Sequence, residues 1–211
     1  MKSSGIIFKQ REFFGSDPGT MYEDVSREQR TCTPTALDYT ELASGLWVPT
    51  FNGSTSVIDT GSDWIGVQSV TISAWLYLSG YGETSGRILD GTQLMLWVSD
   101  TGDRLGIASD GATLVYSATD SIEVSAWYHV MVTRTSAGVI NFYVNAVLSG
   151  SADQDSGTPA AGTNVLIGNK IESERTFDGY ISGLTVYSSI DADPTGFASN
   201  IFQSQRNLYG V

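Results

Sequence analysis

Along most of this chain apolar and polar residues alternate with a period of two, the pattern of β-strands that bury one face. The clearest example is the segment 123–150, in which two strand-length apolar runs are separated by a short turn containing Gly138. In residues 140–148 the even-numbered positions are apolar, whereas residues 127–132 carry bulky side chains on both faces. The segment therefore predicts a β-hairpin whose first strand is central in its sheet.

Further strands are predicted wherever short alternating runs are bounded by turn residues. The run 70–78 alternates strongly, and a meander follows it with turn pairs such as Asp90-Gly91 and Asp110-Gly111. The remaining predictions are strands at 5–14, 46–50, 56–59, 87–89, 94–98, 104–108, 113–117, 165–168 and 176–187, an irregular segment at 21–41, a turn of helix at 63–68, and a helix at 195–203 that begins near Pro194.

Length and composition indicate one domain. With 211 residues the chain can bury a core, and its 23 glycines and 16% charged residues suit many strands joined by tight turns. These features predict a single all-β domain over residues 1–211, an antiparallel jelly-roll β-sandwich of about 12 to 14 strands. Within it, residues 1–45 combine the first strand with an irregular segment that could dock the domain on a partner.

The charge of the chain limits its partners. Its formal net charge of −12 disfavours nucleic acid and anionic membranes, because both require clustered Lys and Arg. No apolar run reaches the roughly 18 residues of a membrane span, and residues 1–14 lack the apolar core of a secretory signal. We therefore expect a protein located in a virion, or outside the cell after lysis. Cys32 is the only cysteine, which excludes an intrachain disulfide and predicts a part-buried, unreactive thiol.

Several segments also resemble one known family, and they follow one another in that family's order. The hairpin AWYHVMVTRTSAGVINFYVNAVLSG resembles the W-x-H-V/L-A-V-T and L-Y-V/I-N-G hairpin of the laminin-G-like, concanavalin A-like jelly rolls. The segments 46–61, 70–78 and 164–189 resemble the F-D-G, T-I-S-A-W and F-x-G strand motifs of the same family. The resemblance covers nearly the whole chain and implies the jelly-roll sandwich. It leaves activity open, because this fold hosts lectins, glycanases, adhesion modules and viral coat or fibre domains.

The chain departs from the family pattern at positions that concern turns and metal ligands. The Asn-Gly turn of the family hairpin is Asn145-Ala146 here, and Ala costs about 1 kcal/mol where positive φ is required. Many relatives hold a structural Ca²⁺, so the resemblance implies Ca²⁺ as the candidate cofactor. Two usual ligand positions are uncharged, however: the family's Asp-Asp pair is Ser182-Gly183, and the Asp of its F-D-G motif is Asn52. The candidate metal ligands are Asp24, Asp178 and the backbone oxygens near Gly53.

Residues for catalysis are sparse. Glycanases of this fold use an E-x-D-x-x-E strand motif to place two carboxylates about 5 to 9.5 Å apart, and the sequence Glu172-Ser173-Glu174 lacks its Asp and its third acid. His129 is the only histidine, and the resemblance implies that it packs and hydrogen-bonds within a strand. We therefore expect no enzyme. The Asp residues that mostly flank Gly or Ser are expected to form turns: Asp90, Asp100, Asp103, Asp110 and Asp120.

Carbohydrate binding needs exposed aromatic rings that stack on sugar faces, with polar side chains nearby as hydrogen-bonding partners. By the resemblance, Trp75 and Trp127 occupy core positions. The aromatic residues left as candidate ligand-binding residues are Tyr81, Trp97, Tyr116 and Trp64, and for each of them a place in the core or at an interface is the alternative.

Several functions stay open at this point. The first is a non-enzymatic structural or adhesive module that decorates the head or tail of a phage virion, with other virion proteins and host-surface or environmental glycans as partners. The run SGLWVPTFNG, residues 44–53, resembles domains of phage virion proteins. The second is a lectin that is secreted or released by lysis, and the third is a glycan-active hydrolase or lyase. A particle component without ligand is the last, in which edge strands pair between copies to form a homo-oligomer.

Overall fold

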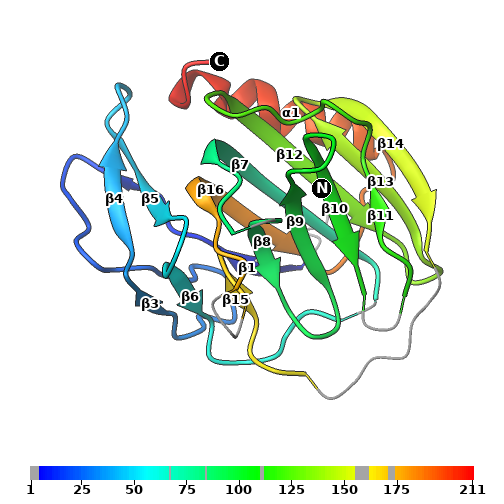
Figure 1. Cartoon of the computed structure of the whole chain (residues 1–211), viewed down its shortest axis with the longest axis horizontal. Helices are drawn as coiled ribbons and strands as arrows, with labels where there is room; N and C mark the ends of the chain where they lie inside the picture. The colour runs from blue at the N-terminus through cyan, green and yellow to red at the C-terminus, as the bar shows by residue number, and fades with distance from the viewer. Residues whose placement is uncertain (1–4, 67, 84, 110–111, 155–161, 171–173) are drawn as a thin grey trace.

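The computed structural model describes residues 5–66, 68–83, 85–109, 112–154, 162–170 and 174–211. These residues form two antiparallel β-sheets that pack face to face, followed by an α-helix and a 3-10 helix (Figure 1). The predicted all-β sandwich is therefore confirmed. In the part of the chain described here, no helix is long and apolar enough to cross a membrane.

The larger sheet contains the longest strands. They are β1 (Ile6–Lys9), β2 (Phe13–Phe14), β4 (Asp38–Glu41), β5 (Leu46–Asn52), β7 (Val70–Gly80), β12 (Trp127–Arg134), β13 (Val139–Val144), β14 (Val147–Asp153) and β16 (Asp178–Tyr187). Seven of these nine strands follow the order β14-β13-β12-β7-β16-β5-β2, while β1 pairs with β16 and β4 pairs with β5. The predicted hairpin strand 127–132 is thus β12, and it lies inside the sheet between β13 and β7.

The smaller sheet contains seven strands in the order β11-β10-β9-β8-β15-β6-β3. They are β3 (Thr33–Thr35), β6 (Val57–Asp59), β8 (Arg87–Asp90), β9 (Met95–Ser99), β10 (Arg104–Ala108), β11 (Val115–Tyr116) and β15 (Leu166–Ile167). Strands β8 to β11 form the predicted meander, which lies in front of β7 and β12 in Figure 1.

The core lies between the two sheets. Ile72 and Leu76 of β7 are on the alternating face that the sequence predicts to be buried, and they pack in one cluster with Leu96 of β9 and Ile107 of β10. Burying one such side chain contributes about 1.5 to 3 kcal/mol relative to leaving it exposed. The opposite face of each strand points out of the sandwich.

The C-terminal segment covers part of the outer face of the nine-stranded sheet. Helix α1 (Pro194–Gln205) begins as predicted at Pro194, and the Asp193 carboxylate accepts a hydrogen bond of 3.0 Å from the backbone N–H of Gly196. The 3-10 helix η1 (Arg206–Leu208) follows it. Helix α1 packs on β12 and β14 and so covers part of this outer face, although Val147 and Leu148 of β14 stay exposed (Figure 1).

A ring of β7 anchors the C-terminal segment. Trp75 is fully buried on the outer face, where it stacks on Tyr209 at 4.3 Å and on Phe202 at 5.7 Å between ring centroids. Its Nε1–H donates a hydrogen bond of 2.8 Å to Oε1 of Gln205. Trp75 is therefore buried as the family resemblance implies, but it lies beneath the C-terminal segment rather than between the sheets.

Some local predictions were wrong. The segment 21–41 contains β3 and β4, which raises the number of strands among the described residues to sixteen. Both strands are short edge strands that pair with β6 and β5, and they bury few side chains, so the sequence pattern does not mark them. The described residues 63–66 form no helix. The predicted turn at Asp110-Gly111 lies outside the described residues.

Two predicted strands are divided. The segment 5–14 forms β1 and β2 with a break between them, and the run 140–148 is interrupted by a turn at Asn145-Ala146. Both turn residues have positive φ, 48° for Asn145 and 69° for Ala146. The family's turn geometry is therefore kept although Ala replaces Gly, and the strain that this substitution implies is present.

Candidate functional site

Three aromatic side chains gather on the outer face of the nine-stranded sheet beyond the C-terminal helices. Trp127 of β12 pairs with Tyr77 of β7, and Tyr77 pairs with Tyr180 of β16. Residues that pair across antiparallel strands point to the same face, so the sheet register itself sets the three rings side by side. Their centroids are 5.6 Å apart for Tyr77 and Trp127, 5.2 Å for Tyr77 and Tyr180, and 5.7 Å for Trp127 and Tyr180. We call these three residues the aromatic cluster.

The aromatic cluster is partly open to solvent, and its polar groups have no partner in the part of the chain that the structure describes. All three side chains are partly exposed. Neither the hydroxyl groups of Tyr77 and Tyr180 nor the Nε1–H of Trp127 makes a hydrogen bond to any described residue. Buried Tyr and Trp side chains usually find such partners, as Trp75 does, so this arrangement is typical of rings that meet a ligand or water.

The C-terminal segment borders the aromatic cluster on one side. Tyr209 contacts Trp127 with ring centroids 4.8 Å apart, and Leu42 and Leu208 pack on the same group of residues. Next to them lies a cavity of about 320 Å³ between the β4–β5 connection and the chain end. It is lined by Leu42, Ala43, Ser44, Asn207, Leu208, Tyr209 and Gly210.

On the other side of the aromatic cluster, the next residues in the same series of cross-strand pairs are polar. Tyr180 pairs with Thr50 of β5, and Thr50 pairs with the exposed Asp38 of β4. The hydroxyl groups of Thr50 and Thr40 lie 2.9 Å apart. Aromatic rings next to hydroxyl and carboxylate groups can stack on the apolar face of a sugar ring and hydrogen-bond its hydroxyl groups.

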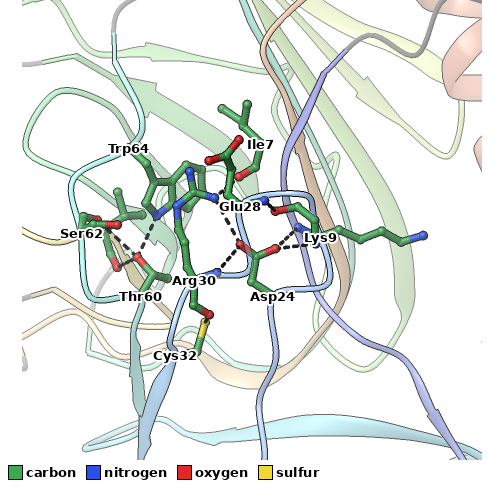
Figure 2. A network of polar contacts seen from close by, with 11 residues as sticks. Ile7, Lys9, Asp24, Glu28, Arg30, Cys32, Thr60, Ser62 and Trp64 are labelled. Atoms are coloured by element: carbon green, nitrogen blue, oxygen red, sulfur yellow. Dashed lines mark hydrogen bonds and ion pairs between the residues drawn. The ribbon is translucent and has the colours of Figure 1, made fainter.

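The sequence-predicted aromatic residue Trp64 has both ring faces occupied. One face stacks on Phe8 at 5.1 Å between ring centroids. The Arg30 guanidinium carbon lies 4.8 Å from the Trp64 ring centroid, and Figure 2 shows Arg30 beside this ring. Its Nε1–H donates a hydrogen bond of 2.8 Å to Oγ1 of Thr60. In this structure the Trp64 ring has no face left for a sugar.

The candidate metal ligand Asp24 lies in the same polar network (Figure 2). One carboxylate oxygen accepts hydrogen bonds from the backbone N–H groups of Lys9 at 3.1 Å and Ser26 at 2.9 Å. The other accepts from the backbone N–H and the guanidinium of Arg30, each at 3.2 Å. Burial alone would raise the pKa of Asp24, but the hydrogen bonds from Ser26, Lys9 and Arg30 outweigh it and lower the pKa. Because these donors fill about four lone-pair sites, Asp24 serves as the centre of a loop rather than offering oxygens to a metal.

The other two candidate metal positions come together at a different place. A Cβ atom built on Gly53 would lie 3.1 Å from Cγ of Asp178, so the Asp178 side chain covers the backbone of this turn. Asn52 caps the same turn, because its Oδ1 accepts hydrogen bonds from three successive backbone N–H groups, those of residues 54 to 56. Among the described residues, no three His, Cys, Asp or Glu side chains are grouped closely enough to hold a metal ion. The calcium prediction therefore depends on Asp178 and the backbone at Gly53.

Of the remaining predicted aromatic residues, Tyr81 follows the end of β7, and the other two lie on strands of the smaller sheet. The Tyr81 hydroxyl donates a hydrogen bond of 2.6 Å to Oδ1 of Asp103, and this ring packs partly on the core. Trp97 and Tyr116 come together on the outer face of the seven-stranded sheet, with centroids 5.8 Å apart and rings perpendicular. Trp97 is only 3% exposed, so its ring supports neighbouring groups and offers no open face of its own.

The aromatic cluster was missed in the sequence, although part of its signal is present there. Alternation places Trp75 with Tyr77 on one face of the segment 70–78, but it does not say which strands are neighbours. The family resemblance also assigns Trp127 to the core, whereas this side chain is partly exposed. His129, in contrast, is fully buried with Nε2 at 2.9 Å from Oγ of Ser73, as expected for a structural residue.

Comparison with known proteins identifies the fold. The family model of the concanavalin A-like lectin/glucanases superfamily matches residues 52–190. No curated protein matches the sequence. Among solved structures, the binding domain of Paraclostridial Mosquitocidal Protein 1 matches 98% of this chain and 55% of its own, with 13% identity and a TM-score of 0.72.

Two further solved structures differ in how much of their length is matched. The structure described as "Cell entry of botulinum neurotoxin type C is dependent upon interaction with two ganglioside molecules" has a TM-score of 0.66 at 11% identity over 95% of this chain and 51% of that one. The heptameric SAP-like pentraxin from Limulus polyphemus has a TM-score of 0.59 at 20% identity over 72% of this chain and 80% of that one. The chain thus spans about half the length of the toxin structures.

Proposed function

We propose that this chain, which belongs to the concanavalin A-like lectin/glucanases superfamily, is a non-enzymatic carbohydrate-binding module. The observation that carries the proposal is the aromatic cluster of Trp127, Tyr77 and Tyr180, whose rings are partly exposed and whose polar groups have no partner among the described residues. In the bound state a sugar ring stacks on these rings, and its hydroxyl groups replace the water that now solvates the two tyrosine hydroxyls and the Trp127 Nε1–H.

Two of the solved structures support this proposal. One is a binding domain of a mosquitocidal protein, and another is described by its interaction with two ganglioside molecules. Gangliosides carry sugars, so a carbohydrate ligand for this chain agrees with the second description. The low identity of 11% to 13% restricts the likeness to the fold, and the position of the sugar site on this chain is argued from the aromatic cluster alone.

A glycan hydrolase is the rival function, and the residues around the aromatic cluster support binding instead. Hydrolysis needs two carboxylates about 5 to 9.5 Å apart on either side of the scissile bond. The series of cross-strand pairs that begins at Trp127 ends at Asp38. The sequence contains no E-x-D-x-x-E motif that would supply a second carboxylate beside it. Placement of the module on a phage virion, with other virion proteins or further copies of the chain as partners, stays a prediction from the sequence.

A glycan-array and polysaccharide screen tests the proposed function. The wild-type protein is expected to bind saturably, and Tyr77→Ala and Tyr180→Ala are each expected to weaken binding about tenfold, since a lost ring contact of roughly 1.4 kcal/mol corresponds to that factor. Phe14→Ala is the matched control, because Phe14 is an aromatic residue that is 53% exposed on the edge strand β2. Binding to no glycan, or equal binding by all variants, would overturn the proposal. Repeating the screen with EDTA tests the calcium prediction for Asp178 and Gly53, and a glycan-cleavage assay tests the hydrolase alternative.

A further inference from the structure

A second row of outward side chains crosses the seven-stranded sheet, on the far side of the sandwich from the aromatic cluster. Arg87 of β8 pairs with Trp97 of β9, Trp97 pairs with Gly106 of β10, and Gly106 pairs with Tyr116 of β11. A Cβ atom built on Gly106 would overlap the Trp97 ring, so the absence of a side chain lets this ring lie flat on the backbone of β10. Trp97 thereby forms a rigid floor between Arg87 and Tyr116.

The guanidinium group of Arg87 is held on this floor by two contacts. Its Nε donates a hydrogen bond of 2.6 Å to Oδ2 of Asp90, and its Cζ lies 5.0 Å from the centroid of the Trp97 ring. The two Nη groups of Arg87, in contrast, have no strong acceptor among the described residues. Nη2 faces Sδ of Met95 at 3.6 Å, a weak acceptor, and neither Nη atom donates to an oxygen of the described residues.

Arg87 lines a shallow cavity of about 130 Å³. Its described lining contains two guanidinium groups, those of Arg87 and Arg175, and no carboxylate. Arg104 lies beside it, with its Cζ 4.2 Å from the centroid of Tyr116. In a chain with a net charge of −12, three guanidinium groups thus gather around two aromatic rings, and the Arg87 group is paired with Asp90. The lining residues are Ser85, Arg87, Met95, Trp97, Leu114, Tyr116 and Arg175.

We infer that this cavity binds the carboxylate or sulfate group of an acidic saccharide. An arginine fork held by a carboxylate at Nε and by a ring beneath it presents both Nη groups in the planar geometry that suits an oxyanion, and its fixation reduces the entropy lost on binding. The cavity volume corresponds to roughly four water molecules, which suits one anionic group with the edge of its sugar ring. Tyr116 and the exposed Leu114 supply apolar contacts for that edge.

The saccharide part of this inference rests on the proposed function, whereas the anion part rests on the arginines. The two sites lie on opposite outer faces of the sandwich, so substitutions at one are expected to leave the other unchanged. An acidic glycan that binds weakly to each face is expected to bind more tightly when several copies of the domain hold it through both faces, as in multivalent binding.

Isothermal titration calorimetry at low and moderate salt tests the inference with matched probes. These are a sialylated oligosaccharide and its desialylated form, an oligouronate, a sulfated disaccharide and inorganic sulfate. The wild-type protein is expected to bind at least one acidic saccharide about tenfold more tightly than the neutral form, with affinity falling as salt rises. Arg87→Lys, which keeps the charge and removes the fork, and Arg175→Gln are each expected to abolish this preference. Arg11→Gln is the control, because Arg11 forms an exposed ion pair with Glu23 elsewhere.

The outcomes separate this inference from the proposed function. Equal binding of acidic and neutral saccharides would overturn the inference and leave the carbohydrate module intact. Loss of acidic binding in Tyr180→Ala but not in Arg175→Gln would place the acidic ligand at the aromatic cluster and also overturn it. Binding of inorganic sulfate without any saccharide preference would exclude a saccharide as the ligand of this cavity. Thermal unfolding of each variant ensures that a lost preference is measured on folded protein, and Arg175→Gln serves if Arg87→Lys does not fold.

Discussion

Acid is expected to weaken the packing of helix α1 against the nine-stranded sheet, because His129 lies between them. The imidazole is fully buried, with ring centroids 5.3 Å from Trp75 and 6.4 Å from Phe202 of α1. Its Nε2 lies 2.9 Å from Oγ of Ser73, while Nδ1 is buried without a partner. Among the described residues, no carboxylate acts on the imidazole to stabilise a positive charge. Burial therefore lowers the pKa of His129 to about 4.

The sign and size of the effect follow from this pKa. In the unfolded chain His129 takes up a proton below a pKa of about 6.5, whereas in the folded protein it stays neutral until about pH 4. The contribution of neutral His129 to the free energy of unfolding is therefore fully present above pH 6.5 and is lost as the pH falls toward 4. A difference of about 2.5 pKa units at 1.36 kcal/mol each amounts to about 3 kcal/mol of unfolding free energy. This is a large fraction of the 5 to 15 kcal/mol typical of a domain, by the usual rough range.

Urea unfolding of the wild type and of His129→Gln between pH 7.5 and pH 4 measures this contribution. The glutamine amide can still reach Ser73, and since His129 is the only histidine, every other group titrates equally in both proteins. The wild type is expected to lose about 3 kcal/mol more than the variant over this range. Stability curves that stay parallel would show that His129 is protonated in the folded state, and the reasoning from burial would then be wrong.

Three further outcomes are expected from local features. Ala146→Gly should stabilise the protein by about 0.5 to 1 kcal/mol in chemical denaturation, because Ala146 has a φ of 69°; an unchanged midpoint would show that the turn is unstrained. Gly106→Ala should cost about 1 to 3 kcal/mol by displacing the Trp97 ring, seen also as a change in near-ultraviolet circular dichroism. Burial raises the pKa of Cys32 to about 12, so a thiol reagent at pH 8 should react with it about 100-fold faster after denaturation; rapid labelling of native protein would contradict this.

The fold could be predicted because its signals are local. Strand β7 alternates along its length, the turn at Asn145-Ala146 keeps its family position, and the sequence around Pro194 marks the start of α1. Strands β3 and β4 escaped prediction because they carry few buried apolar residues and form only through pairing with β6 and β5. Their existence depends on neighbours that are distant in sequence, which periodicity does not report.

The candidate sites could be predicted only in part. Alternation in β9 shows that Trp97 points away from Leu96 and Val98, but not that Arg87 covers the ring. The aromatic cluster depends on the register among β12, β7 and β16, which sets Trp127, Tyr77 and Tyr180 together from segments about 50 residues apart. Such pairing is decided by packing of the whole sheet rather than by any local pattern.

Backbone amide NMR during titration with the tightest-binding glycan from the array tests the central claim most directly. The account predicts progressive, saturable shift changes on the outer face of the nine-stranded sheet, at Tyr77, Trp127, Tyr180 and the adjoining Thr50, with smaller changes at Tyr209. It also predicts that these changes disappear in Tyr180→Ala and persist in Phe14→Ala. Shift changes confined to other surfaces, for example around Asp178 and Gly53, would contradict the assignment of carbohydrate binding to the aromatic cluster.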